Sequence, residues 1–293
     1  MAVPPAGRLE MQGSRLFLEH RVGRLWLLLV YAFLYIPLIF LMVFSFNSTR
    51  QDGVFTGFSL RWYVALLSDS RLVDGFLLSL RVALLTGTLS VMLGSFAAFV
   101  LVRYLRFSGR TLFYGLVSAP LVMPEVIIGL SLLLLMVAVQ RASGWPERGF
   151  ITITAGHTLL GMAYATVVIQ SRLAEMDRAI EEAAMDLGCR PMQVFFLVTL
   201  PCIAPALVSS WLLTFTLSFD DVVISEFLSG PGVTTLPQVI FSYARRGVNP
   251  SIYAAATLLI AAVSLGIIAY SLFMARRQRR LVREANAAIR AGD

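Results

Sequence analysis

Six apolar runs, each about as long as a bilayer is thick, constrain the fold of this chain more than any other feature. They cover approximately residues 25–46, 82–102, 113–139, 152–170, 203–222 and 252–274. A helix needs roughly 20 apolar residues to cross a hydrocarbon core of about 30 Å, because backbone groups in lipid must be satisfied within the segment. Since 58% of the residues are hydrophobic and only 14% are charged, we expect an all-α membrane protein with six transmembrane helices.

The arginines predict how these helices are oriented. The chain contains no Lys, so all 24 basic residues are Arg. Sixteen of them lie before the first run, after the second and fourth runs, or in the C-terminal tail, whereas seven lie in the opposite set of loops. Because positively charged loops remain in the cytoplasm, both termini are predicted to be cytoplasmic. Residues 1–24 and 275–293 would then flank a membrane domain at 25–274, and the basic tail would rest on anionic lipid. We do not expect nucleic-acid binding.

Residues 171–201 form a charged, amphipathic loop between the fourth and fifth runs. Apolar residues recur there at three- and four-residue intervals, at Leu173, Met176, Ile180, Ala184 and Leu187. This spacing predicts a helix from Leu173 onward. Gly188 is suited to cap it and Pro191 to begin a second short helix. The periodicity leaves open a helix lying on lipid, but the charged face is acidic and fits a basic protein pocket better than an anionic leaflet.

The same loop contains a recognisable motif. Its residues are Glu182, Ala183, Ala184, Gly188, Val198, Leu200 and Pro201. This resembles the EAA pattern E-A-A-x3-G-x9-I-x-L-P of bacterial ABC importer permeases, with Val198 in place of Ile. The resemblance implies that the loop forms coupling helices that sit in a cleft of a separate ATPase subunit. The residues it implicates in ATPase coupling are Glu181, Glu182, Ala183, Ala184, Asp186, Gly188, Arg190 and Pro201.

Motifs for ATP hydrolysis and for common catalytic chemistry are missing from the sequence. A phosphate-binding loop G-x-x-x-x-G-K-[ST] requires a Lys, and the chain has none. The sequence also contains no H-E-x-x-H and no G-x-S-x-G. We therefore expect that the chain is not an enzyme and binds no cofactor itself. The resemblance implies that ATP and Mg are bound by a partner ATPase.

Further stretches make the resemblance more specific. They are FNSTR (46–50), RWY (61–63), APLVMPEVIIGLSLLLL (119–135), GWPERG (144–149), SRLAEMDRAIEEAAMDLG (171–188) and SFDDVVISEFLSGPGVTTLPQVIFSYARRGVNP (218–250). They are similar to the second permease subunits of bacterial putrescine and spermidine importers. The resemblance implies a type I ABC importer permease fold in the bacterial inner membrane. It also implies a homologous permease subunit as heterodimer partner, two ATPase subunits and a periplasmic polyamine-binding protein.

Candidate residues for the path of a polyamine are acidic or aromatic, because ammonium groups are attracted to carboxylates and ring faces. Glu125 lies well inside the third run, directly after Pro124, which is expected to kink the helix. A carboxyl group at that depth indicates a transport pathway or a structural pair with an Arg or a hydroxyl group of a neighbouring helix.

Asp220 and Asp221, at the end of the fifth run, would form an acidic outer mouth together with Glu226. Such a mouth would concentrate a dication. The alternatives are that the Asp pair is solvated at the helix end or that it pairs with Arg245 and Arg246. Trp211 shares a face with two phenylalanines, and that face fits helix packing more often than a cation path. We expect His157 to be a packing residue whose polar atoms are satisfied within the chain.

Other transport functions stay open at this point. One buried carboxyl among six helices also suits a proton-coupled secondary transporter, although that class leaves the EAA spacing unexplained. Within the ABC importers, the solute could be spermidine, iron or an inorganic anion instead of putrescine. The acidic mouth argues against an anion.

Overall fold

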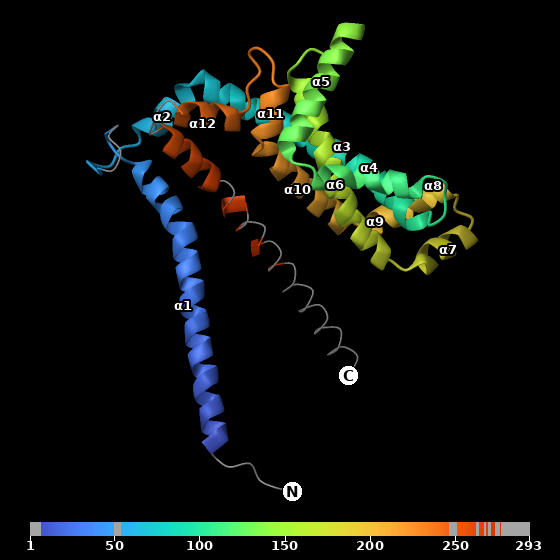
Figure 1. Cartoon of the computed structure of the whole chain (residues 1–293), viewed down its shortest axis with the longest axis horizontal. Coiled ribbons are helices and arrows are strands. Elements are labelled where there is room, and N and C mark those ends of the chain that lie inside the picture. Colours follow the sequence, from blue (N-terminus) through green and yellow to red (C-terminus); the bar gives the residue numbers. More distant parts are fainter. Residues whose placement is uncertain are drawn as a thin grey trace. The chain divides into compact units, whose positions relative to one another are not determined.

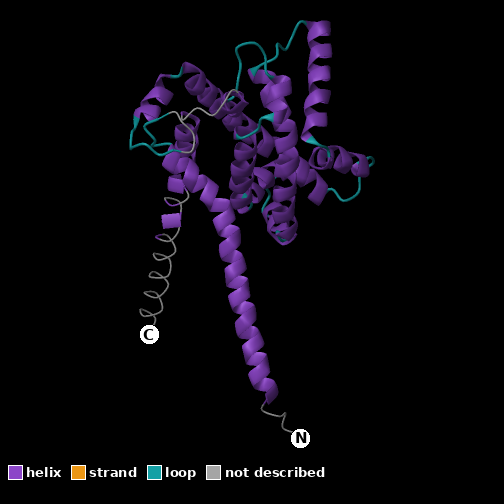
Figure 2. Ribbon diagram, turned by 60° about the vertical axis from the view of Figure 1, so that its left-hand side comes forward, coloured by secondary structure: helices purple, strands orange, loops and turns teal. Residues whose placement is uncertain are grey.

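The computed structural model of the chain describes residues 7–49, 54–245 and 251–261. It also describes residues 264–266, 268, 271, 272 and 276. This part of the chain is almost wholly helical, as Figure 2 shows. The named helices are α1 (Gly7–Phe44), α2 (Arg61–Ser68), α3 (Ser70–Arg103), α4 (Arg110–Val122), α5 (Glu125–Ser143), α6 (Phe150–Glu175), α7 (Arg178–Asp186), α8 (Pro191–Val194), the π-helix η1 (Phe195–Thr199), α9 (Leu200–Cys202), α10 (Ala204–Phe219), α11 (Val223–Leu228) and α12 (Leu236–Arg245).

The chain divides into two compact units, one made of residues 1–68 and 246–293 and the other of residues 69–245. In the first unit, the loop after α1 folds back so that the two short motifs at 46–50 and 61–63 meet. The indole NH of Trp62 donates to the carbonyl of Asn47 at 2.7 Å, and the Phe46 and Phe58 rings stack with centroids 5.2 Å apart. Residues 251–261 of this unit are helical.

The second unit is built around α3, α6 and α10, which run side by side in Figure 1. Its apolar core has two parts. One contains Val82, Ile128, Ile153, Leu160, Ile224 and Leu228, and the other contains Ala98, Ala165, Ile169, Leu173 and Ile203. The helix α6 contributes to both parts, and it therefore connects the two ends of the bundle.

Small residues allow α3 and α6 to approach closely. Ser90 and Ala98 are fully buried, and a methyl group added at Gly94 would lie 2.8 Å from Cβ of Ala165. The approach is matched from α6, where a Cβ at Gly161 would collide with the Ser90 side chain. The face of α3 that carries these small residues therefore packs inside the bundle.

The third apolar run is not one helix, and the prediction of a continuous span over 113–139 is wrong. The chain breaks at Met123 and Pro124, between α4 and α5, and the two helices point in different directions in Figure 1. Proline has no amide to donate and excludes the preceding residue from helical geometry, and Met123 accordingly adopts an extended conformation with ψ of 137°. Glu125 is therefore the first residue of α5 and does not lie inside a continuous helix.

Four described helices are long and apolar enough to cross a bilayer: residues Gly23–Phe44 of α1, and α3, α5 and α6. A fifth span results if Pro191–Cys202 and α10, which meet at 73°, are taken together. The sixth predicted span, 252–274, lies partly outside the described residues, as does most of the tail from 275. The structure thus confirms a helical, multi-span chain, and six spans stay a prediction.

The amphipathic helix predicted from Leu173 onward begins later. The helix α6 extends through Glu175, so Leu173 belongs to its last turn and is buried in the core. The chain then turns at Met176 and Asp177, and the Asp177 side chain accepts a hydrogen bond from the amide of Ala179 at 2.9 Å to begin α7. An N-cap of this kind competes with helix continuation, which periodicity does not detect.

Gly94→Ala is expected to lower the free energy of unfolding by about 1–3 kcal/mol, because the added methyl overpacks the α3–α6 contact. The matched control is Gly115→Ala in α4, where nothing lies within 4 Å of the added carbon. That change should be neutral or stabilising by up to about 1 kcal/mol through helix propensity. Thermal unfolding of both variants in detergent measures the difference, and equal melting temperatures would contradict the packing model.

Candidate functional site

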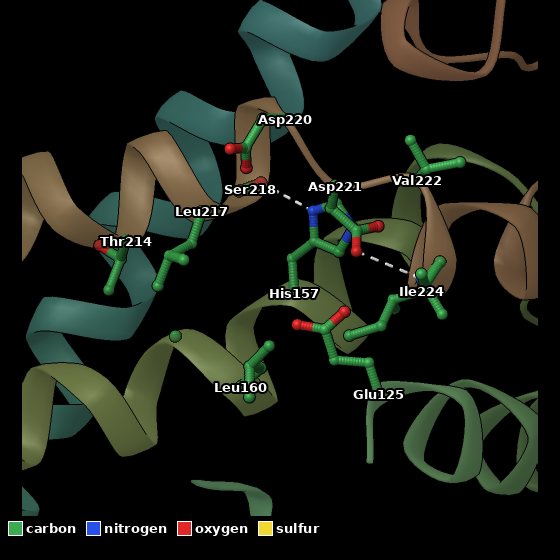
Figure 3. A pocket seen from close by; sticks show the side chains of 12 residues that line it. Glu125, His157, Leu160, Thr214, Leu217, Ser218, Asp220, Asp221, Val222 and Ile224 are labelled. Carbon is green, nitrogen blue, oxygen red and sulfur yellow. Dashed lines mark hydrogen bonds and ion pairs between the residues drawn. The ribbon is translucent and has the colours of Figure 1, made fainter. Parts of the chain in front are cut away.

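A cavity of about 370 Å³ brings together carboxylates from distant parts of the sequence. Its charged or titratable lining residues are Glu125 of α5, His157 of α6, and Asp220 and Asp221 after α10. Figure 3 shows that the Glu125 side chain extends toward the side of the cavity where His157 and Asp221 lie. We call this the acidic cavity. It unites three of the five residues predicted for the substrate path.

His157 and Asp221 form a buried pair in the wall of the acidic cavity. Nε2 of His157 lies 3.0 Å from Oδ2 of Asp221, and their side chains are 2% and 9% exposed. Ser218 Oγ lies 2.7 Å from Nδ1 of the ring, and Ser225 Oγ lies 3.1 Å from Nε2. The ring is thus hydrogen-bonded on both nitrogens and held in one orientation. His157 is thus the satisfied, buried residue that was expected, and it also lies in the wall of the acidic cavity.

Asp221 also holds the start of α11. Its Oδ2 accepts the amide of Ser225 at 2.8 Å, and its Oδ1 accepts the amide of Ile224 at 3.3 Å. A carboxylate at a helix N-terminus is favoured by the unpaired amides and by the helix dipole. These bonds satisfy Asp221 within the chain. The alternative pairing with Arg245 is not seen, because its guanidinium lies over the ring of Phe241, and Arg246 lies outside the described residues.

The other two carboxylates of the acidic cavity are exposed. Asp220 ends α10 and Glu125 begins α5, and both are exposed. Among the described residues, the Glu125 side chain takes part in no hydrogen bond or ion pair, and the Asp220 carboxylate forms no ion pair and accepts only from its own backbone amide. Glu125 at a helix N-terminus is electrostatically favoured there. The structural pairing considered for Glu125 is therefore not present in the described chain.

Glu226 and Trp211 lie apart from the lining of the acidic cavity. The carboxylate of Glu226 accepts a hydrogen bond from the side-chain amide of Gln238, with Nε2 and Oε2 3.0 Å apart. The Trp211 indole packs against Gly87 of α3 and stacks on Phe215 with centroids 5.2 Å apart. Both arrangements favour packing over a role in a cation path.

The second site is residues 171–201, which the sequence predicted to couple to an ATPase and which we call the coupling segment after that prediction. Its motif glycine, Gly188, has φ of +91°, a region that favours glycine. The backbone amide of Gly188 donates to the carbonyl oxygen of Met185, and that of Cys189 donates to the carbonyl oxygen of Ala184. These two bonds form the Schellman motif at the end of α7. Pro191 then starts α8. The predicted cap and the predicted second helix are confirmed.

Two consecutive glutamates of the coupling segment differ in environment. Glu182 is exposed, whereas Glu181 is 8% exposed and ion-paired to Arg103, with Oε2 of the glutamate 2.8 Å from Nε of the arginine. Thr199 donates its hydroxyl to the same carboxylate at 2.7 Å. Removing one partner from a buried pair is costly, about 3–5 kcal/mol, because the other charge is left uncompensated. Glu181 is thus largely enclosed by the chain, whereas Glu182 is open to solvent.

The remaining motif residues lie on the outer surface. Glu182, Ala183, Asp186, Gly188, Arg190 and Pro201 are exposed, and Ala184 is half-buried. Leu187 and Met192 beside them are 87% and 62% exposed. Charged and large apolar side chains thus share one open surface, as is common where a partner binds.

The sequence of this chain matches the profile of the inner membrane component of binding-protein-dependent transport systems over residues 90–283. That range contains both the acidic cavity and the coupling segment. The chain belongs to this family. The predicted resemblance to importer permeases is therefore confirmed.

Curated relatives specify the resemblance further. The chain is 52% identical over 266 residues to the putrescine transport system permease protein PotI of Escherichia coli K12, covering 90% of this chain and 94% of the relative. It is 36% identical over 264 residues to the spermidine/putrescine transport system permease protein PotC of Haemophilus influenzae, covering 90% and 98%.

Solved structures share the fold. A bacterial ABC transporter involved in the import of the acidic polysaccharide alginate has a chain that matches with a TM-score of 0.71 at 17% identity, covering 92% of this chain and 99% of that one. The same transporter in complex with an alginate pentasaccharide-bound periplasmic protein matches with a TM-score of 0.69 at 18% identity, covering 92% and 98%. These likenesses place the chain in the fold of ABC transporter permeases.

Neighbouring aspartates should differ in their effect on stability. Asp221→Ala removes the partner of His157 and of two amides, and should lower the free energy of unfolding by about 1–3 kcal/mol. Asp220→Ala, the matched control, removes an exposed carboxylate and should leave stability within about 0.5 kcal/mol of the parent. Thermal unfolding of the purified proteins tests this, and a larger loss at Asp220 would refute the assignment.

Proposed function

We propose that this chain is the transmembrane permease subunit of an ATP-driven importer of polyamines, and that its substrate is putrescine. The observation that carries the proposal is the 52% identity to a putrescine permease over 90% of the chain. Spermidine is the second candidate, supported by the 36% identity to a spermidine/putrescine permease.

The acidic cavity suits a dication. Glu125 and Asp220 present two carboxylates that no other described residue neutralises, and Asp221 lies in the wall beside them. Two negative groups match the two ammonium groups of putrescine in number and sign. The exposure of both carboxylates keeps each interaction modest, which allows the substrate to leave as well as to bind.

The proposed assembly has several partners. A homologous permease subunit would complete the translocation path as a heterodimer, and a periplasmic polyamine-binding protein would deliver the substrate. Two ATPase subunits would bind ATP and Mg, while this chain binds no cofactor. The assembly would lie in the bacterial inner membrane with both termini of this chain in the cytoplasm, consistent with the distribution of arginines.

The coupling segment would dock on the ATPase through its exposed surface. The exposed acidic and apolar side chains of α7 and the loop after it suit a partly basic, partly apolar cleft better than an anionic lipid surface. Arg178 and Glu182 lie at a cavity of about 280 Å³ between the end of α3, α7 and α8, whose wall also contains Arg103, Glu181 and Thr199. The alternative is that this segment lies on the lipid surface and does not dock on a protein.

Reconstitution distinguishes this proposal from a secondary transporter. The chain, co-purified with the proteins that assemble with it, is placed in proteoliposomes together with putrescine-loaded binding protein. The proposal predicts that putrescine uptake requires internal ATP and that the loaded binding protein stimulates hydrolysis. Uptake that needs only a proton gradient and persists without ATP would refute it.

Glu125→Ala should lower the putrescine uptake rate at least tenfold while leaving assembly intact, because the exposed carboxylate makes no bond within the described chain. Uptake in proteoliposomes and the yield of the assembled complex are measured in parallel. Glu226→Ala is the control, since Glu226 does not line the acidic cavity. Equal loss of uptake and assembly at Glu125 would indicate a structural role.

Glu182→Arg should abolish co-purification of the ATPase, because it reverses a charge on the exposed docking surface. Uptake should be lost as a result. Gly188→Pro should also abolish uptake, since φ of +91° is inaccessible to proline and the cap of α7 would be disrupted. Insertion in the membrane should persist in both variants and is checked by the yield of the permease itself. Normal uptake in either variant would contradict the docking assignment.

A further inference from the structure

The acidic residue next to the motif glutamate makes contacts of a different kind from a docking residue. Glu181 is buried in the chain, and its carboxylate binds two elements outside α7. One oxygen lies 2.8 Å from Nε of Arg103, the other accepts from an Nη of the same guanidinium at 3.1 Å. This two-point contact fixes the orientation of the carboxylate as well as its position.

The second partner of Glu181 comes from the segment that follows α8. Thr199 is the last residue of the π-helix η1, is fully buried, and donates its hydroxyl to the glutamate at 2.7 Å. A π-turn inserts an extra residue relative to an α-helix and rotates the side chains that follow it. Thr199 leads directly into α9 and then into the 73° bend before α10.

Arg178 adds a second attachment between α7 and α3. Its guanidinium donates to the carbonyl oxygens of Val102 and Arg103, at 3.1 and 3.2 Å. These are among the last carbonyls of α3, which have no partner within the helix, and a cation is favoured at this end of the helix dipole. The first turn of α7 therefore holds the C-terminus of α3 through both a carboxylate and a guanidinium.

We propose that the Arg103–Glu181–Thr199 cluster is the internal link through which movement of α7 is passed to α3 and to α10. Glu181 is then a positioning residue, while the adjacent Glu182 contacts the partner. The inference rests on the proposed function, since it presupposes an ATPase that moves α7. The geometry supports it because one carboxylate binds a residue 78 positions before it and another 18 positions after it, and so joins three elements. A force on α7 then acts on helix ends and not on a flexible loop.

The test uses the complete importer in proteoliposomes and measures putrescine uptake per ATP hydrolysed. Glu181→Gln removes the charge and keeps the shape. It should leave ATPase co-purification and basal hydrolysis unchanged, reduce stimulation by loaded binding protein to about onefold, and lower uptake at least tenfold. Glu175→Gln is the matched control, because that glutamate pairs with Arg172 on the exposed surface, and its coupling ratio should equal that of the parent.

Rescue distinguishes positioning from general stabilisation. The double variant Arg103→Glu with Glu181→Arg restores opposite charges and should recover at least a third of the parental coupling ratio. Thr199→Val removes the hydroxyl at constant shape and should lower the ratio several-fold, whereas Thr199→Ser should retain it. The threonine pair keeps the proposal testable if Glu181→Gln or the charge swap does not fold.

Each contrary result is specific. A parental coupling ratio in Glu181→Gln or in Thr199→Val would overturn the link. Loss of the ATPase from the Glu181→Gln complex, as expected for Glu182→Arg, would make Glu181 a docking residue and also overturn it. Failure of the loaded binding protein to stimulate hydrolysis by the parent complex would instead refute the proposed function itself.

Discussion

The close approach of α3 and α6 is the interaction on which the two sites depend. It requires that neither helix carry bulk where they cross, and Gly94 and Gly161 meet that requirement with contacts that a single methyl group would overfill. Because α6 is one continuous helix of 26 residues, about 39 Å long at 1.5 Å per residue, it carries His157 near its start and the first residues of the coupling segment at its end. The acidic cavity and the coupling segment are thus attached to the same rigid element.

Adjacent residues of the same chemistry are divided between structure and surface in both sites. In the acidic cavity Asp221 is enclosed by His157 and two amides, while Asp220 is exposed. In the coupling segment Glu181 is enclosed by Arg103 and Thr199, while Glu182 is exposed. The enclosed member has its hydrogen-bond partners within the chain. The exposed member keeps its charge available for a ligand or partner.

Local signals in the sequence predicted the features that depend on local chemistry. Gly188 and Pro191 were assigned correctly because a left-handed cap and a helix start each require a particular residue type within a few positions. The break at Pro124 was expected only as a kink, because hydrophobicity continues through it and the length of the run suggested one span. Local rules describe such a proline, but only packing decides between a kink and two separate helices.

Long-range partners were beyond that kind of reasoning. His157 contacts Asp221 across 64 positions, and Arg103 contacts Glu181 across 78. Periodicity assigns a residue to a face of a helix, but it does not say which residue of another helix meets that face. A weak signal existed for His157, since a polar ring within an apolar span is expected to have a partner. Glu181 had no comparable signal, because it sits in a charged loop beside a glutamate that carries the motif.

The sign and number of charges also bear on what ATP would do in the proposed importer. An inside-negative potential already favours inward movement of a dication by roughly 4–5 kcal/mol per 100 mV. The cavity therefore does not need to bind the substrate strongly, and two exposed carboxylates are adequate. The energy of ATP would instead be required at the other end of α6, where the enclosed Glu181 joins α7 to α3 and η1. Such an importer requires strong interactions within the chain and weak interactions with the substrate. The burial of the His157–Asp221 and Arg103–Glu181 pairs agrees with this requirement.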